Sequence, residues 1–479
     1  MSEIKKLKRV LGFWPAYGAA VGLVVSGTAM FSVGNVGGTT GYATIITAAI
    51  ALIPMMCAAF AYGELASMLP GSGMISDYTL PALGRFWSIF SLLSGYVVLI
   101  AADGGTQLVM GGLSMNSLVG IPQPIVTATL FLFVIFINLR GVGFYGKTEA
   151  IVTVAMMIVF ALLSILGFAR VGETMGAVPV NESLSFLPEG GWTTVFGTVG
   201  VAIWFFIGFE FALPLAEENK KPYRNLPYGL ILGLLSIYII DIIFSAASVR
   251  YTSLDVLLNS AIPHVEGARA MLGEAGFITI SLLTIAASLT TANAYTAALP
   301  RMLYGMARES LVPSMFAKIH PKYRTPWNGI FFTGLLMFIT FLYITMNGAD
   351  VDTVLVFINT ASITWMISYA IAMLNVLILR KKYPDFPRLW KAPLAWVTLP
   401  IGILGVIYAI WTLKPYWMNA LIAMAIVAIY ALLWLNYKKI PIFEKTPLEN
   451  ITKEIQTRSE YLPIWDEKVT EWLNKQSPR

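Results

Sequence analysis

Three carboxylic acids stand inside long apolar stretches of the sequence: Asp103, Glu210 and Asp241. An ionisable side chain at the centre of a bilayer costs at least ~2.5 kcal/mol, so such residues commonly mark substrate sites or proton relays. Small neighbours leave space beside Asp103, and its carboxylate would suit a cationic amine through a charge-assisted hydrogen bond. A structural hydrogen bond and a proton relay are the alternatives for Asp103. Asp241 has no charged companion on nearby turns and is interpreted as a packing residue.

Glu210 lies two residues after a glycine that interrupts its apolar stretch. Burial disfavours the charged form of a carboxyl, so Glu210 is predicted to take up and release protons near neutral pH. The alternative is a protonated acid that holds neighbouring helices together. The position beside the glycine favours a proton-coupling or gating role.

Two apolar stretches contain such interruptions near mid-length, at Ser26-Gly27-Thr28 and at Ile207-Gly208. Glycine costs ~1 kcal/mol relative to alanine in a helix, and Ser and Thr hydroxyls can bond to the backbone locally. A broken helix frees N–H and C=O groups, which a membrane tolerates only where they line a cavity. Glycines also serve close helix packing. Interruptions at corresponding places in two halves of a chain favour a transporter binding site.

These stretches are about 20 residues long, which matches ~30 Å of hydrocarbon at 1.5 Å per helical residue. The 479-residue chain is 57% hydrophobic and only 12% charged, whereas soluble domains carry roughly 25% charged residues. The composition therefore predicts an all-α polytopic membrane protein. It argues against a disordered chain, a disulfide scaffold (Cys57 is the one cysteine) and a β-barrel, whose strands would alternate over ~10 residues.

Twelve transmembrane helices are predicted, and with them three regions of the chain. The blocks lie near 13–34, 41–66, 86–112, 122–139, 148–169, 193–216, 227–249, 274–300, 327–346, 352–379, 395–413 and 416–436. Residues 1–12 precede a transmembrane domain at 13–436, and residues 437–479 form a polar C-terminal tail. Spans one and six are expected to be equivalent members of two five-helix halves, near 13–170 and 193–379. The halves have opposite topology because five is odd, and 395–436 supplies two additional helices.

The basic residues predict the orientation of the chain. With both termini cytoplasmic, 28 of the 32 Lys and Arg residues fall on the inner side, as the positive-inside rule requires. The predicted location is the cell membrane, with both termini and the tail in the cytoplasm. The net positive charge is attributed to this orientation, and no nucleic-acid partner is expected.

Five motifs resemble those of a known group of transporters. They lie at 25–27 (Val-Ser-Gly), 63–73 (Gly-Glu-Leu-Ala-Ser-Met-Leu-Pro-Gly-Ser-Gly), 204–210 (Trp-Phe-Phe-Ile-Gly-Phe-Glu), 217–227 and 306–313. With these motifs the sequence resembles the amino acid–polyamine–organocation (APC) superfamily, particularly bacterial arginine/agmatine and polyamine exchangers. That family usually has Gly-Ser-Gly where this chain has Val25-Ser26-Gly27. The resemblance implies a LeuT-like five-plus-five inverted repeat followed by two further helices.

The resemblance also implies roles for individual residues. An acid at the position of Glu210 serves that family as a gate and proton-coupling group. Asp103 falls where related exchangers place a cavity-lining asparagine, and Tyr295 falls where they place an aromatic residue facing the substrate. Trp204, one turn before the second interruption, and Tyr295 are therefore expected to occlude the site and to hold organic cations by cation–π attraction.

Other mechanisms lack the residues or the surroundings that they need. One Gly-x-x-x-x-Gly-Lys-Thr run occurs, at 141–148, but it stands between two predicted membrane helices and does not follow a strand, so direct use of ATP is not expected. The sequence shows no residue pattern for an intramembrane enzyme. No metal site or cofactor is predicted, because His264 and His320 are expected in loops on opposite sides. Ser288, Thr290 and Thr291 could supply oxygens to sodium, but such hydroxyls more commonly bond back to their own helix.

The sequence therefore predicts a secondary active transporter for an amino acid or organic amine, not an enzyme. A substrate amine would meet carbonyls near Leu23 and Ile207, and a carboxylate would meet amides around Ser26–Thr28. Asp103 and Val25 favour a cationic amino acid or a polyamine as the substrate. Transport is predicted to be coupled to protons or to proceed by exchange. The alternatives are a neutral amino acid or ethanolamine-like permease, a channel and a transport-like sensor. The predicted oligomeric state is a monomer or a homodimer.

Overall fold

The computed structural model describes residues 9–71, 73–140 and 145–476. Most of the predicted segment 1–12, and with it the basic residues before Arg9, lies outside the described residues. The described part of the chain folds into a bundle of helices and contains no β-strand beyond one isolated bridge between Leu11 and Asn219. The prediction of an all-α architecture is therefore confirmed for these residues.

Most of the predicted spans are found as helices. The first half contains α1 (Phe13–Gly22), α2 (Gly27–Thr40), η1 (Gly41–Ala43), α3 (Thr44–Met68), α4 (Met74–Ala82), α5 (Arg85–Leu92), the π-helical turn η2 (Leu93–Val97), α6 (Val98–Val119), α7 (Gln123–Arg140), α8 (Tyr145–Phe168) and η3 (Val171–Met175). The next segments are α9 (Trp192–Gly197), α10 (Val199–Ala202), η4 (Ile203–Phe205), η5 (Phe209–Glu217), α11 (Pro222–Tyr251), α12 (Leu254–Asn259) and α13 (Pro263–Arg308). The remainder comprises η6 (Ser314–Ala317), α14 (Trp327–Asn347), α15 (Val351–Lys382), α16 (Ala395–Thr412), η7 (Lys414–Tyr416), α17 (Trp417–Tyr437), α18 (Leu448–Arg458) and α19 (Pro463–Gln476).

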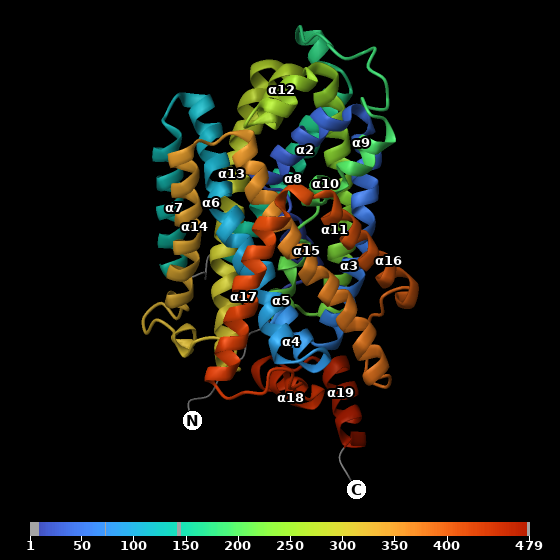
Figure 1. The fold of residues 1–479 in the computed structure, drawn as a ribbon, viewed down its shortest axis with the longest axis vertical. Helices are drawn as coiled ribbons and strands as arrows, with labels where there is room; N and C mark the ends of the chain where they lie inside the picture. The colour runs from blue at the N-terminus through green and yellow to red at the C-terminus, as the bar shows by residue number, and fades with distance from the viewer. Residues whose placement is uncertain (1–8, 72, 141–144, 477–479) are drawn as a thin grey trace.

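Ten helices in the described part of the chain are long and apolar enough to cross a membrane, or eleven if the bent pair α10–η5 counts as one span. The chain is therefore a polytopic membrane protein. Long spans run roughly along the vertical axis of the bundle (Figure 1). The count of twelve and the inverted repeat remain predictions. Two predicted spans are not continuous helices: the first is divided into α1 and α2, and the sixth into α9, α10, η4 and η5.

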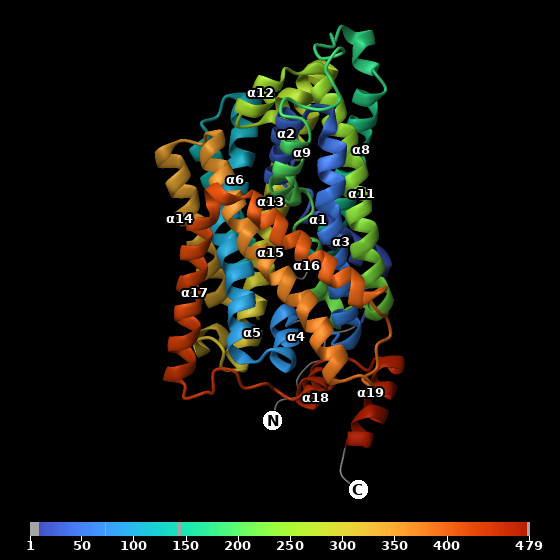
Figure 2. The ribbon, with the colours of Figure 1, turned by 45° about the vertical axis from the view of Figure 1, so that its right-hand side comes forward.

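The described part of the chain begins and ends at one end of the bundle, which we call the terminal face (Figures 1 and 2). The short helix α12 lies at the opposite end. Helices α18 and α19 lie at the terminal face: α18 lies below α4, and α19 extends away from the bundle (Figure 2). The sequence predicted only a polar tail here, whereas the structure has two helices, and the Trp465 and Trp472 side chains of α19 are buried.

A buried charge cluster fixes the end of α3 at the terminal face. The Glu64 carboxylate is fully buried and accepts hydrogen bonds from the Arg380 guanidinium at 2.9 and 2.5 Å and from the Ala392 amide at 2.8 Å. The Arg388 Nε atom lies 3.1 Å from the same carboxylate. Burial lowers the pKa of Arg388, and the Glu64 charge opposes that shift. One acid therefore joins α3 to α15 and to the segment that follows it.

Candidate functional site

The first helix break lies between α1 and α2, at the predicted place. Helix α1 ends at Gly22, and Ser26 caps α2 by accepting a hydrogen bond from the Ala29 amide at 3.2 Å. A serine oxygen at this position satisfies one of the amides that the first helical turn leaves without a partner. The Thr28 amide points to Gln107 Oε1 at 3.4 Å. The break thus presents the first-turn amides of α2 at the interior of the bundle.

The second break follows η4, and it contacts the first. Gly208 has φ +110°, between η4 and the 3-10 helix η5, and the two helical pieces are bent by 40°. A Cβ atom on Gly208 would lie 2.4 Å from Leu23 Cδ2. Glycine is needed here for two reasons: the left-handed backbone and the close approach of Leu23. The two breaks therefore meet inside the protein.

Gly208→Ala is expected to destabilise the protein by ~1–3 kcal/mol, the cost of a non-glycine residue in a rarely populated backbone conformation. Displacement of Leu23 adds to this cost. The melting temperature of the purified protein in detergent checks the prediction. The matched control is Gly197→Ala, because a Cβ atom on Gly197 would meet no atom within 4 Å. Equal melting temperatures for the two variants would contradict the close contact between the breaks.

Asp103 lies beside the first break in a fully buried hydrogen-bond network. Its Oδ1 accepts from the Thr28 hydroxyl at 2.9 Å, and its Oδ2 accepts from the Tyr295 hydroxyl at 2.7 Å and the Gln107 amide at 3.0 Å. Trp204 Nε1 donates to Thr28 Oγ1 at 3.1 Å. The structure thus brings together four side chains singled out in the sequence, from α2, α6, η4 and α13.

Gln107 is the member of this network that sequence reasoning missed. Its Nε2 donates to Thr28 Oγ1 at 2.6 Å as well as to Asp103. Because the Thr28 oxygen accepts from both Gln107 and Trp204, its proton is directed at Asp103. A usable signal was present, since residues four apart share a helix face and Gln107 follows Asp103 by four positions.

Glu210 lies on η5 in a second buried network. Its Oε1 accepts from the Tyr96 hydroxyl at 3.0 Å and from Trp365 Nε1 at 2.6 Å, and its Oε2 accepts from the Tyr369 hydroxyl at 2.5 Å. The Gly208 amide donates to the Tyr369 oxygen at 3.1 Å. Tyr369 therefore joins the second break directly to the acid. Within the described residues, neither Glu210 nor Asp103 forms an ion pair.

The three donors to Glu210 were not anticipated from the sequence. Trp365 and Tyr369 lie on α15, 155 and 159 positions from Glu210. Tyr96 lies in the π-helical turn η2, within the span that also carries Asp103. Single π-helical turns often occur at functional sites, but the sequence carries no clear signal for one here.

Phe211 connects the two networks. Its ring centroid lies 5.9 Å from that of Tyr295 and 5.8 Å from that of Trp365. Tyr295 donates to Asp103 and Trp365 donates to Glu210. A change in the position or protonation of one acid can therefore affect the other through the packed rings of Tyr295, Phe211 and Trp365.

Two hydroxyl groups of α13 have no hydrogen-bond partner among the described residues, and one of them lies beside the first break. Ser288 Oγ and Thr291 Oγ1 are buried and unpartnered among the described residues, and Ser288 Oγ would lie 2.5 Å from a Cβ atom on Gly27. Thr290 instead donates back to the carbonyls of Ala286 and Ala287, both at 3.0 Å. The sequence-based expectation of back-bonding thus holds for one of the three hydroxyls.

Two other polar residues lie away from the breaks. Asp241 is buried in α11, and no described residue donates a hydrogen bond to it. The expectation that His264 lies in a loop is wrong, because it belongs to the first turn of α13. It is fully buried, and its Nε2 lies 3.0 Å from Thr284 Oγ1. The left-handed backbone of Gly273 separates this turn from the rest of α13.

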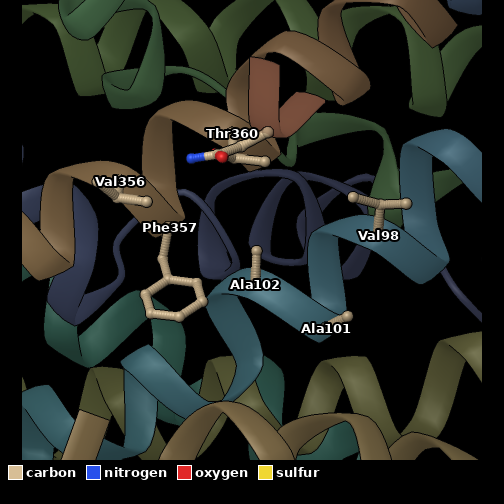
Figure 3. Close-up of a pocket in the computed structure, with 7 residues that line it drawn as sticks. Val98, Ala101, Ala102, Val356, Phe357 and Thr360 are labelled. Carbon is tan, nitrogen blue, oxygen red and sulfur yellow. The ribbon is translucent and has the colours of Figure 1, made fainter. Parts of the chain in front are cut away.

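The predicted site is closed to solvent in this conformation. Side chains at both breaks and both acids are at most 4% exposed: Leu23, Ser26, Thr28, Asp103, Trp204, Ile207, Glu210 and Tyr295. Two adjoining cavities of about 200 and 520 Å³ lie between α6 and α15, the smaller bounded also by α17 and the larger by α14, and no residue of this set lines them. Figure 3 shows the smaller one, with Ala102 on α6 and Thr360 on α15. The larger one reaches Asp352.

Comparison with known proteins finds similarity to membrane transporters. A family model described as amino acid permease matches residues 11–436. The branched-chain amino acid permease BcaP of Bacillus subtilis is 28% identical over 81% of this chain and 84% of its own. The serine/threonine exchanger SteT of the same organism is 26% identical over 82% and 88%. A manganese transporter of Eremococcus coleocola shares the fold, with a TM-score of 0.59 and 15% identity over 93% of this chain and 99% of that one.

Proposed function

The chain belongs to the amino acid permease family, within the APC superfamily, and from this premise we propose that it is a secondary active transporter for an amino acid or a related amine. It works by alternating access to a site between the two helix breaks. The observation that carries the proposal is the contact between the breaks at Leu23 and Gly208, with a buried carboxylate beside it. Polar backbone inside a membrane protein is tolerated where it lines a binding cavity.

The two breaks supply complementary charges to a zwitterionic substrate. The first-turn amides of α2, at Gly27 and Thr28, attract a carboxylate because a helix N-terminus carries partial positive charge. Carbonyl oxygens near Leu23 and Ile207 attract the α-amino group. Trp204 and Tyr295 close over the substrate. A bound substrate must displace part of the present packing, since this region is shielded from solvent.

For the substrate class, we propose an amino acid whose side chain bears an amine, or a polyamine. The supporting observation is that Asp103 is fully buried and is surrounded by neutral donors, with no cationic side chain among the described residues to balance it. The second candidate is a neutral amino acid. It is favoured by the relatives, which include a branched-chain amino acid permease and a serine/threonine exchanger, and by the three hydrogen bonds that already satisfy Asp103.

For coupling, we propose that Glu210 carries the proton. Its carboxyl is the acid nearest to the second break, and Tyr369 bonds to both the acid and the Gly208 amide. Substrate contact with Tyr295 would reach Glu210 through Phe211 and Trp365. Sodium is the alternative: Ser288 and Thr291 offer buried hydroxyl oxygens without a partner, that of Ser288 beside Gly27, but they supply no negative charge.

The arrangement in the membrane completes the proposal. We place the transporter domain at 13–436, with twelve spans, repeats near 13–170 and 193–379, and the tail at 437–479. The terminal face is cytoplasmic in the cell membrane, because the basic residues concentrate at the predicted inner loops. No cofactor enters the mechanism.

The test is flux through purified protein in liposomes. Labelled amino acids with cationic and neutral side chains are offered with and without proton and sodium gradients. We expect saturable uptake that unlabelled substrate inside the vesicles accelerates, because counterflow requires a site that alternates between the two sides. Non-saturating flux without counterflow would indicate a channel, and binding without flux would indicate a sensor. Either result would reject the proposal.

A further inference from the structure

The inner ends of the two broken spans are joined to each other at the terminal face. The Leu11 amide donates to the Glu218 carbonyl, and the Lys220 amide donates to the Leu11 carbonyl, both at 2.9 Å. Leu11 lies two residues before α1, and Glu218 directly follows η5. Helices α1 and η5 extend from the breaks to this face, so the bridge ties together the parts of both spans that must separate to open the site here.

Arg9 strengthens this bridge and connects it to the C-terminal tail. Its Nη1 donates to the carbonyls of Ala216 and Asn219, at 2.8 and 3.0 Å. Its Nε donates to the Glu460 carbonyl, and its own amide donates to Glu460 Oε2, both at 3.0 Å. One side chain thus links the segment before α1, the end of η5 and the turn between α18 and α19.

Burial and charge hold Arg9 in place. Burial lowers the pKa of Arg9, whereas the carboxylates of Asp466, Glu217 and Glu460 raise it. Two of these three acids belong to the tail. The tail therefore supplies much of the negative charge that offsets the cost of burying a guanidinium between two gating helices.

The rest of the tail is anchored to helices outside this bridge. Trp465 is buried, and its Nε1 donates to the Met68 carbonyl at the end of α3, at 2.8 Å. The Trp472 ring packs against Phe386, with 4.9 Å between centroids. The Arg85 amide donates to the Glu444 carbonyl at 3.0 Å. The tail is thus fixed to α3, α5 and the segment after α15.

From these contacts we infer that the C-terminal tail is part of the gate at the terminal face: it holds Arg9, and so keeps the inner ends of α1 and η5 together. The inference rests on the proposed alternating access. Opening toward this face requires α1 or η5 to move away, and neither can do so while Arg9 is bonded to the anchored tail. Glu460 is the residue through which the tail sets how often this gate opens.

The test reads gate opening without relying on transport. Ala216 is fully buried beneath Arg9, so a cysteine there can be labelled only when the gate opens. In a Cys57→Ala background, Ala216→Cys is labelled with an uncharged maleimide, whose local concentration does not depend on nearby charges. Glu460→Gln is expected to raise the labelling rate about tenfold: its amide oxygen can still accept from the Arg9 backbone amide, but the negative charge beside the buried guanidinium is lost. The matched control is Glu471→Gln, an exposed acid of the same tail that pairs with Lys475; it should leave the rate unchanged.

Two further outcomes decide between a gate and a purely structural contact. Arg9→Gln should raise the rate at least as much, because it removes the guanidinium that bonds to the Ala216, Asn219 and Glu460 carbonyls. The Arg9→Gln, Glu460→Gln double variant should match Arg9→Gln alone, because the Glu460 charge acts through the guanidinium. An unchanged or slower labelling rate in Glu460→Gln, or multiplying effects in the double variant, would overturn the inference. If liposomes show no transport at all while labelling responds as expected, the proposed function fails and the gate stands.

Discussion

Glu210→Gln is expected to flatten the pH dependence of transport and to lower the transport rate by about ten- to a hundredfold. Glutamine has nearly the same shape but cannot exchange a proton. Both carboxylate oxygens of Glu210 accept hydrogen bonds, from Tyr96 and Trp365 at Oε1 and from Tyr369 at Oε2. A glutamine offers one carbonyl oxygen, so at least one of these donors would face an NH₂ group. Leaving a buried donor without an acceptor costs ~1–3 kcal/mol, and about 1.4 kcal/mol corresponds to a factor of ten.

The measurement is the initial rate of uptake into proteoliposomes over a range of pH on each side of the membrane. Glu189→Gln serves as the control, because Glu189 is exposed on the loop before α9 and the charge change is the same. The affinity for substrate should change little, whereas the dependence of the uptake rate on pH should change strongly. A rate that falls by the same factor at every pH would assign Glu210 to cross-linking η5, α15 and η2, and an unaltered profile would remove its coupling role.

The helix breaks could be predicted because their causes are local. Glycine, serine and threonine weaken a helix wherever it is, so Ser26-Gly27-Thr28 and Gly208 locate the breaks at α1–α2 and η4–η5. The contact between the breaks needed a second argument, the equivalence of spans one and six in opposed halves. That equivalence is still a prediction, although Leu23 and Gly208 touch.

The partners of the two acids could not be predicted in the same way. Glu210 needs donors, but the chain contains 27 Phe, 21 Tyr and 13 Trp residues, and periodicity does not distinguish Trp365 and Tyr369 from other aromatic residues of the core. Their approach to η5 depends on how α15 packs across the bundle. The tail poses the same difficulty. Trp465 and Trp472 alternate with charged residues, and only the packing of α19 against the terminal face shows that both are buried.

Asp103→Asn is expected to weaken the binding of substrates with an amine-bearing side chain by about ten- to a hundredfold relative to neutral substrates, because a hydrogen bond to a charged group is worth ~1.5–3 kcal/mol. Asparagine keeps one acceptor oxygen but loses the negative charge. Thr28 Oγ1 already accepts from Gln107 and Trp204, so it is poorly placed to accept a third donor from asparagine. Some loss for every substrate should accompany the selective loss.

The ratio of the inhibition constants for cationic and neutral substrates separates the lost charge contact from the rearranged network. Inhibition constants for a cationic and a neutral amino acid are compared in the parent protein, in Asp103→Asn and in the control Asp352→Asn, whose carboxyl is exposed beside the larger cavity. A rearranged network weakens both ligands alike, whereas a lost charge contact weakens only the cationic one. Equal losses would therefore assign Asp103 to holding Thr28, Gln107 and Tyr295 in place. In that case the charge of the site would come from the helix breaks alone, and the neutral amino acid would become the favoured substrate.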